Sequence, residues 1–231
     1  MGERPRVEEN TVSIPLSIDV VSDVVCPWCY VGKRRLEHAL AQRPDIVANV
    51  TWLPFFLDGR IPREGIARTE YISKKFGIHG RLTPTHEKLV GIGAPLGIDF
   101  AFERIERQPN TLDAHRVIAW AQQAGDAAPV VDRLFRMFFS EGRDLSDPET
   151  LVTAGVAGGL DADELRRDLA GERDVALVEQ QAAAASSAGI GGVPFFVFGK
   201  KVSVAGAHEI EVMLKAIDHA AGNGPDSPNV A

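Results

Sequence analysis

The sequence predicts an α/β protein in which a β-α-β unit and a β-β-α unit are separated by a long helical segment. Near the start, two apolar, β-branched runs flank a helical pattern. Strand-like runs return only near the end, before a last amphipathic helix. The segment between, roughly 60–188, has helical spacing and no strand-like alternation. This order is typical of a mixed sheet that carries an all-helical insertion.

The individual elements follow from periodicity and from proline positions. Pro44 ends the first helix, and Pro54 places the far end of the second strand at a sheet edge or a bulge. Asp147 before Pro148 is typical of a helix start. The outer units are expected to contain strands over 16–25, 48–56, 195–198 and 202–205, and helices over 30–43 and 208–221. The middle segment is expected to contain helices over 69–76, 112–124, 130–141, 148–155 and 161–185.

This order predicts two domains. The first is discontinuous and comprises 14–60 and 189–221. The second is the helical insertion, 61–188. Residues 1–13 and 222–231 are expected to be disordered tails, because they mix charges, prolines and turn residues.

Composition excludes several classes of protein. The 231 residues include 25 Lys and Arg against 32 Asp and Glu, so the net charge is −7. A nucleic-acid or anionic-membrane partner would need a basic face and is not expected. No apolar run approaches the roughly 20 residues of a membrane span, and residues 1–15 lack a secretory signal. We therefore expect a cytoplasmic protein, either a monomer or a homodimer, in which two cysteines favour catalysis or metal binding over structural cross-linking.

The most informative motif is Cys26-Pro27-Trp28-Cys29, between the first expected strand and helix. Pro27 suits the first helical position, where its missing N–H is no loss. The free N–H groups and the dipole of the helix start are then expected to stabilise the Cys26 thiolate, the reacting species. Cys29 follows one turn later and is placed to reach back to Cys26. The motif indicates a nucleophile with a resolving thiol.

Two other interpretations of the cysteine pair remain open. The pair could be half of a zinc site, but a closed site needs four ligands and the sequence has no second cysteine pair. The nearest histidine, His38, lies on the same expected helix. Two inert buried cysteines would also fit, although C-x-x-C beside a β-α pattern favours redox chemistry.

The residues around the cysteines suggest substrate contacts. Pro27 and Trp28 are candidates, because the second helical position is expected to face outward and to offer an apolar surface to a partner. The alternative for Trp28 is a core position. Lys33, Arg34 and Arg35 are expected to form a solvated helix face, with a modest contribution to thiolate stability as the alternative.

Val193-Pro194 opens the third expected strand, where a missing N–H is tolerated. The sequence alone does not decide whether this bond is cis, since only about 5–6% of such bonds are. In the cis form, the Val193 backbone would be free to pair with an extended substrate near Cys26.

These motifs together resemble the DsbA-like branch of the thioredoxin superfamily, and most closely its cytoplasmic FrnE type. The resemblance covers residues 16–221 and implies a thioredoxin-like fold interrupted by a helical domain. It rests on SDVVCPWCYVGKRRLE (22–37), NTLDAH (110–115), LFRMFFSEGRDLSD (134–147) and GVPFFVF (192–198).

The resemblance also implies roles for individual residues. Cys26 matches the family nucleophile, Cys29 the resolving cysteine, and Pro194 the cis-proline that faces them. Asn110 and His115 match helical-domain positions that often line the cleft. A satisfied core or surface histidine is an equal alternative for His115.

One departure bears on the co-substrate. Members of this type often read S-G-A-Q before the last helix, where this chain has Ala205-Gly206-Ala207-His208. In glutathione-using relatives this helix start holds the γ-glutamyl carboxylate, and the N–H groups of Gly206 and Ala207 remain candidate ligands for an anion. The missing serine leaves either glutathione or another low-molecular-weight thiol as co-substrate. No metal or tightly bound cofactor is expected, and neither GxGxxG nor GxxxxGK occurs.

The leading prediction is a thiol–disulfide oxidoreductase acting on a protein or small-molecule disulfide or dithiol, with its redox direction open. The rival enzyme class resembles 2-hydroxychromene-2-carboxylate isomerase and kappa-class glutathione transferase, which activate a bound thiol with a serine at the Cys26 position. A third class is a non-catalytic binding module that uses the surface formed by Trp28 and Val193.

Overall fold

A computed structural model describes residues 13–77 and 83–222. Most of both tails predicted to be disordered lie outside the described residues. Nothing within the described ranges forms a helix long and apolar enough to cross a membrane.

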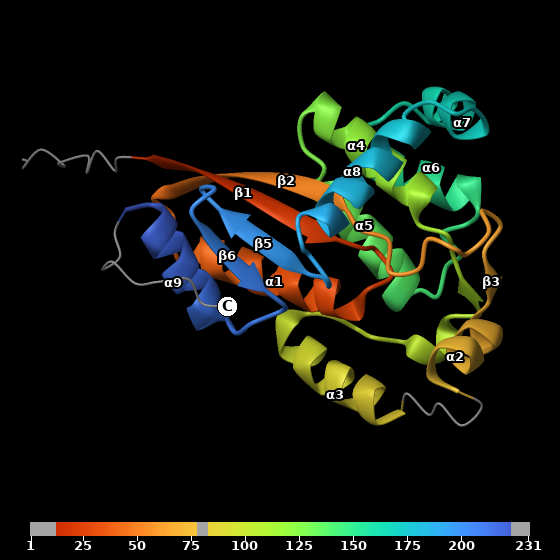
Figure 1. Ribbon diagram of the computed structural model, residues 1–231, viewed down its shortest axis with the longest axis horizontal. Coiled ribbons are helices and arrows are strands. Elements are labelled where there is room, and N and C mark those ends of the chain that lie inside the picture. The colour runs from red at the N-terminus through yellow and green to blue at the C-terminus, as the bar shows by residue number, and fades with distance from the viewer. Residues whose placement is uncertain (1–12, 78–82, 223–231) are drawn as a thin grey trace, which may run out of the picture.

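A four-stranded mixed sheet forms the centre of the protein (Figure 1). Its order is β2-β1-β5-β6, with β1 and β2 parallel and the other neighbours antiparallel. Helix α1 connects β1 to β2, and α9 packs against α1, β5 and β6. The predicted β-α-β and β-β-α units are confirmed. Their elements are β1 (Ile14–Ser22), α1 (Pro27–Ala41), β2 (Ile46–Pro54), β5 (Phe195–Phe198), β6 (Val202–Ala205) and α9 (Ile210–Ala220).

The ends of the two parallel strands follow from local chemistry. Strand β2 is an edge strand, as Pro54 predicted, but it runs from Ile46 to Pro54, so the predicted extension to residue 56 is wrong. Strand β1 ends at Ser22, so the predicted extension to residue 25 is wrong. The reason is Asp23, whose buried carboxylate accepts hydrogen bonds from the N–H groups of Val25 (3.5 Å) and Leu57 (2.9 Å). These bonds turn the chain away from the strand before α1 begins.

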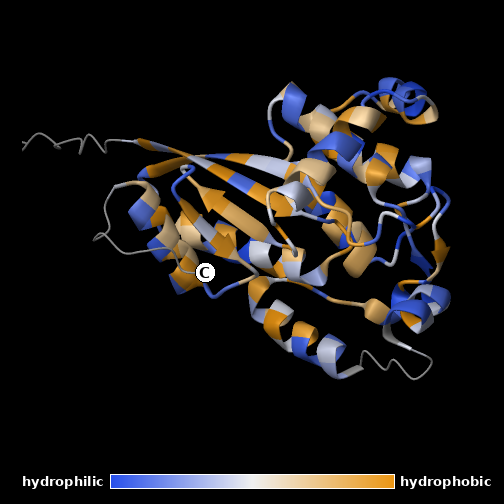
Figure 2. Cartoon of the chain, in the orientation of Figure 1, coloured by the Kyte–Doolittle hydropathy of each residue, from blue (hydrophilic) through white to orange (hydrophobic). Residues whose placement is uncertain are grey.

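The insertion is helical except for a two-residue antiparallel ribbon formed by β3 and β4, which the sequence did not predict. Helix α3 was not predicted either. Figure 2 shows hydrophobic residues along β5, whereas α7, at the far side of the insertion, is mostly hydrophilic. The elements of the insertion are β3 (Ile66–Ala67), α2 (Arg68–Phe76), α3 (Thr83–Gly93), β4 (Arg107–Gln108), α4 (Leu112–Ala124), α5 (Ala128–Phe139), α6 (Pro148–Ala157), α7 (Ala162–Ala170) and α8 (Val175–Ser187), with short 3₁₀ turns at Ala94–Leu96 and Phe102–Arg104.

The helix predicted over 161–185 is two helices, α7 and α8. Between them Asp174 has a positive φ of 60°, which interrupts the helical path. A fully buried Arg116 donates hydrogen bonds to the carbonyl oxygens of Asp168 (2.6 Å), Gly171 (2.9 Å) and Arg173 (2.7 Å). The Asp168 carbonyl also accepts the Gly171 N–H at 3.2 Å. By binding all three carbonyl groups at the break, the guanidinium stabilises the corner.

The basic triplet on α1 is mostly enclosed, so the predicted solvated face is wrong. Lys33, 2% exposed, donates to Asp132 of α5 at 3.0 Å. Arg35, 7% exposed, binds the Glu209 carboxylate at 2.6 Å and the Ala207 carbonyl at 2.6 Å. Both side chains therefore join α1 to neighbouring elements.

Helix α1 also packs very closely on β5. A Cβ atom at Gly32 would lie 2.9 Å from Pro194 Cγ and 3.0 Å from Phe196 Cζ. Only glycine allows this approach, because any larger residue would press into the proline ring and the buried phenylalanine.

We expect Gly32→Ala to destabilise the protein, because overpacking typically costs about 1–3 kcal/mol and outweighs a helix-propensity gain of about 1 kcal/mol. Gly91→Ala in α3 is the matched control, since a Cβ there meets nothing within 4 Å. That variant should be as stable as the wild type or more so. Urea unfolding measures both free energies, and a fully stable Gly32→Ala variant would disprove the packing argument.

Candidate active site

The cysteine pair lies where β1 leads into α1. Cys26 is the N-cap of α1, with an extended backbone (φ −93°, ψ 112°), and Pro27 is the first helical residue. The Cys26 carbonyl accepts the N–H groups of Cys29 at 3.0 Å and Tyr30 at 3.4 Å. The predicted helix start is therefore confirmed. Both cysteines are free thiols, close to each other.

The two thiols have different surroundings. Cys29 is 1% exposed, and burial raises the pKa of its thiol well above the ordinary 9.0, as do its hydrogen bond and electrostatic interaction with Cys26. The Ser22 side chain and the Asp23 backbone act in the opposite direction, but their effect is smaller. Cys29 therefore stays protonated at neutral pH.

The Val193–Pro194 peptide bond is cis and lies beside Cys26. The Cys26 thiol donates to the Val193 carbonyl oxygen, with the sulfur 3.6 Å away. The Pro194 carbonyl in turn accepts the Gly206 N–H at 2.7 Å, which ties this segment to the end of β6. Cys26 is only 5% exposed, so it is largely buried in this structure.

A surface cavity of about 350 Å³ reaches this segment from the outside. Four of its nine lining residues are glycines, and both residues of the cis bond line it. The lining residues are Gly189, Ile190, Gly191, Gly192, Val193, Pro194, Phe195, Ala205 and Gly206.

Trp28 is partly buried and packs against the core, so its predicted outward orientation holds only in part. The Lys88 ammonium of α3 lies 6.0 Å from the centre of its ring, within the range of a cation–π contact. Trp28 therefore connects the cysteine motif to a helix of the insertion.

His115 and Asn110 occupy different places. His115 is 5% exposed, and its Nε2 lies 3.6 Å from Asp23 Oδ1, without a hydrogen-bond partner in the described part of the chain. It thus reaches the turn that precedes the cysteines. Asn110 instead donates its side-chain amide to the Ile61 carbonyl at 2.6 Å and accepts the Leu112 N–H at 2.9 Å. Through these two hydrogen bonds, Asn110 holds the segment that follows β2.

The start of α9 is already engaged within the chain. The Gly206 N–H is used by Pro194, and the Ala207 carbonyl by Arg35. Arg35 also pairs with Glu209, the N-cap of α9. The Gly206 N–H, one of the two predicted anion ligands, is therefore already engaged within the chain.

Two polar residues of the site were missed. Ser22 and Asp23 contact Cys29 from the end of β1. The signal for Asp23 was an acidic residue inside an otherwise apolar run, which in a buried position must bind something. Within residues 13–77 and 83–222, no cluster of three or more His, Cys, Asp or Glu side chains is placed to hold a metal ion.

A cysteine pair at the start of the first helix, beside a cis-proline that precedes β5 of a β2-β1-β5-β6 sheet, places the protein in the thioredoxin fold class. The model of the DSBA-like thioredoxin domain family matches residues 17–218. The chain therefore belongs to the DSBA-like thioredoxin family, as predicted.

Two proteins are similar to this chain at about 30% identity. The uncharacterized protein YwbO of Bacillus subtilis (strain 168) is 30% identical over 202 residues, which is 87% of this chain and 94% of YwbO. The crystal structure of the probable DsbA oxidoreductase SCO1869 from Streptomyces coelicolor is 29% identical, with a TM-score of 0.80 and coverage of 92% and 93%.

More distant structures share the fold alone. A 2-hydroxychromene-2-carboxylate isomerase has 18% identity and a TM-score of 0.62, and the match covers 88% of this chain and 95% of the isomerase. The cytosolic disulfide reductase DsbM from Pseudomonas aeruginosa, solved with GSH, has 17% identity and a TM-score of 0.54, with coverage of 89% and 96%.

The difference between the thiols predicts an order of chemical modification. Iodoacetamide near pH 8 should label Cys26 before Cys29, because the raised pKa and deeper burial of Cys29 leave little reactive thiolate there. Peptide mapping by mass spectrometry follows both sites with time. Equal or faster labelling of Cys29 in the folded protein would contradict the assignment.

Proposed function

We propose that this protein is a thiol–disulfide oxidoreductase in which Cys26 is the nucleophile and Cys29 the resolving thiol. The observation that carries the proposal is the asymmetry of the pair. Cys29 lies deeper, with a raised pKa, while Cys26 stands at the helix N-terminus beside Val193. Membership in the DSBA-like family and the similarity to a probable DsbA oxidoreductase support an oxidoreductase-type activity.

The chemistry balances as two thiol–disulfide exchanges. The Cys26 thiolate attacks one sulfur of a substrate disulfide, which forms a mixed disulfide and releases the first substrate thiolate. Cys29 then loses its proton and attacks the Cys26 sulfur. The second substrate thiolate leaves, and a Cys26–Cys29 disulfide forms. The substrate gains two electrons, and the protein loses two. The reverse sequence oxidises a substrate dithiol.

The segment at Val193 and Pro194 is proposed to position the substrate. An extended substrate that pairs with the Val193 backbone would displace the contact between Cys26 and the Val193 carbonyl, and so would uncover the sulfur. The cavity beside this segment gives such a substrate a path of approach. Pro27 and Trp28 would form the other wall of the proposed substrate site.

A low-molecular-weight thiol such as glutathione is proposed to regenerate the dithiol when the protein acts as a reductase. The DsbM structure solved with GSH supports this choice only through the shared fold. The engaged start of α9 argues for a thiol held by contacts other than the Gly206 N–H. A cytoplasmic location accords with this chemistry and remains part of the proposal.

An isomerase or transferase that activates a bound thiol is the second candidate, supported by the fold shared with the isomerase structure. That chemistry needs no resolving thiol, whereas Cys29 lies in contact with Cys26. A partner-binding module is the third, and it would not need the Cys26 sulfur.

The Cys29→Ser variant distinguishes the oxidoreductase from the other two candidate functions. The reduced variant should form one stable mixed disulfide per chain with glutathione disulfide, because no second thiol can release it. Intact-mass measurement and peptide mapping should place the adduct on Cys26, and Cys26→Ser should form no comparable adduct.

Wild-type protein under the same conditions should pass to the Cys26–Cys29 disulfide. Sustained disulfide turnover by Cys29→Ser would refute the resolving role. If Cys26→Ser kept full biological activity, the binding-module interpretation would replace the enzyme.

A further inference from the structure

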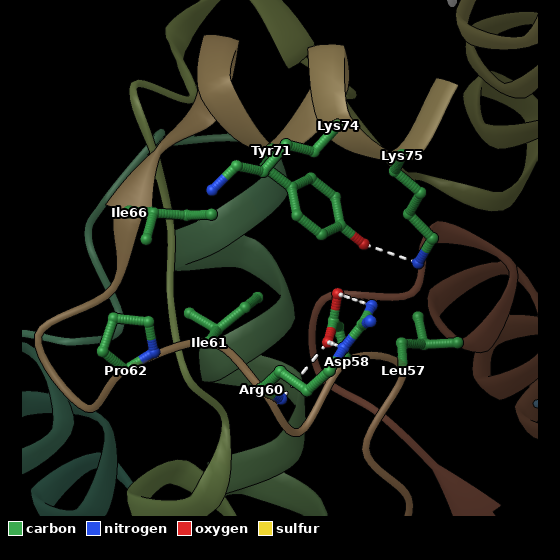
Figure 3. A pocket seen from close by; sticks show the side chains of 9 residues that line it. All are labelled: Leu57, Asp58, Arg60, Ile61, Pro62, Ile66, Tyr71, Lys74 and Lys75. Atoms are coloured by element: carbon green, nitrogen blue, oxygen red, sulfur yellow. Dashed lines mark hydrogen bonds and ion pairs between the residues drawn. The ribbon is translucent and has the colours of Figure 1, made fainter. Parts of the chain in front are cut away.

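A second cavity, of about 400 Å³, lies between the segment that follows β2 and helix α2 (Figure 3). Its volume is within the range of small-molecule binding sites. Neither cysteine lines it. The lining residues are Leu57, Asp58, Arg60, Ile61, Pro62, Ile66, Tyr71, Lys74 and Lys75.

The cavity has an apolar wall and a cationic rim. Leu57, Ile61, Pro62, Ile66 and the ring of Tyr71, which is 7% exposed, supply the apolar part. Three cationic side chains and one carboxylate complete the lining, so its net charge is positive in a chain whose net charge is −7. The cations are Arg60, Lys74 and Lys75, and the carboxylate is Asp58.

Two of the three cations are already neutralised. Arg60 binds Asp58 in a two-point contact, Nε to Oδ1 at 2.9 Å and Nη2 to Oδ2 at 3.1 Å. Lys74 pairs with Glu70 at 2.6 Å. Lys75 has no ion-pair partner among the described residues, although its charge, after the hydrogen bond from Arg60, also helps to lower the pKa of the Asp58 carboxyl.

Lys75 is held in place by a tyrosine rather than by an acid. Its ammonium donates to the Tyr71 hydroxyl oxygen at 2.6 Å, and no carboxylate of the described residues lies within ion-pair distance of it. Because the Tyr71 oxygen accepts this bond, its own O–H remains able to donate. Figure 3 shows the Tyr71 hydroxyl and the Lys75 ammonium side by side, with the Asp58–Arg60 pair next to them.

The wall opposite α2 is fixed to the rest of the structure. The Leu57 N–H donates to the buried Asp23 carboxylate at 2.9 Å, and the Asn110 amide holds the Ile61 carbonyl at 2.6 Å. Buried or half-buried partners therefore hold this wall at both ends. Because the wall is already ordered, the entropic cost of ordering it on ligand binding is small.

We propose that this cavity is a binding site for a small organic carboxylate with an apolar body, whose carboxylate accepts hydrogen bonds from Lys75 and Tyr71. The apolar body would lie along Ile61 and Ile66. A carboxylate suits the donors, because both supply N–H or O–H groups and a charge-assisted bond is the stronger kind. This site does not depend on the chemistry of the cysteines.

Isothermal titration with phenylbutyrate as the probe tests the site, with the uncharged phenylbutyramide as the matched ligand control. We expect saturable one-site binding of the acid and binding of the amide that is weaker by about tenfold or more. Lys75→Met keeps the apolar part of the side chain and should weaken binding of the acid by a similar factor. Tyr71→Phe should weaken binding of the acid by a smaller factor, because it removes the hydroxyl group but keeps the ring.

Lys215→Met, which removes an exposed charge from α9, is the matched protein control and should leave binding unchanged. A variant with both cysteines replaced by serine should also bind normally, which separates this site from the proposed redox function. Absence of saturable binding up to about 10 mM would overturn the proposal. Equal losses in Lys75→Met and Lys215→Met would overturn it too, since they would indicate a general charge effect.

Discussion

The close approach of α1 to β5 is the constraint on which the site depends. Gly32 leaves no room for a Cβ between the helix and the Pro194 and Phe196 rings. This contact brings the start of α1 up to the segment that carries Val193, so that the Cys26 thiol meets its carbonyl oxygen. The hydrogen bond from the Gly206 N–H to the Pro194 carbonyl oxygen connects the same segment to the end of β6. Cys26 is largely buried at its contact with Val193, and in the proposed function an incoming substrate would displace that contact.

The insertion completes this site as well as covering the sheet. Tyr30, the residue after Cys29, stacks on Phe135 of α5 at 5.0 Å between ring centres and meets Phe100 edge-on at 6.0 Å. His115 of α4 reaches Asp23, whose backbone contacts Cys29. The core of buried side chains therefore continues from the sheet into the insertion. A change in the packing of α4 or α5 is expected to alter the surroundings of the buried thiol.

The sequence predicted the elements that local chemistry determines. The β-branched runs identified the strands, Pro27 after Cys26 identified the helix start, and Pro54 marked the edge of the sheet. Features set by distant partners were missed. Lys33 and Arg35 lie two positions apart on α1 and therefore point to different sides of the helix. The acids that join them to other elements are 99 and 174 positions away in sequence, so nothing local indicated burial. The break before α8 depends on Arg116, more than fifty positions earlier. The domain boundaries at 60 and 189 stay a prediction.

The redox equilibrium of the cysteine pair is the most direct test. The protein is equilibrated with mixtures of reduced and oxidised dithiothreitol, quenched in acid, and its free thiols are counted by mass after alkylation. The account predicts a single reversible two-electron transition between the dithiol and an intramolecular Cys26–Cys29 disulfide. Failure to form that disulfide within one chain, while the fold is intact, would contradict it.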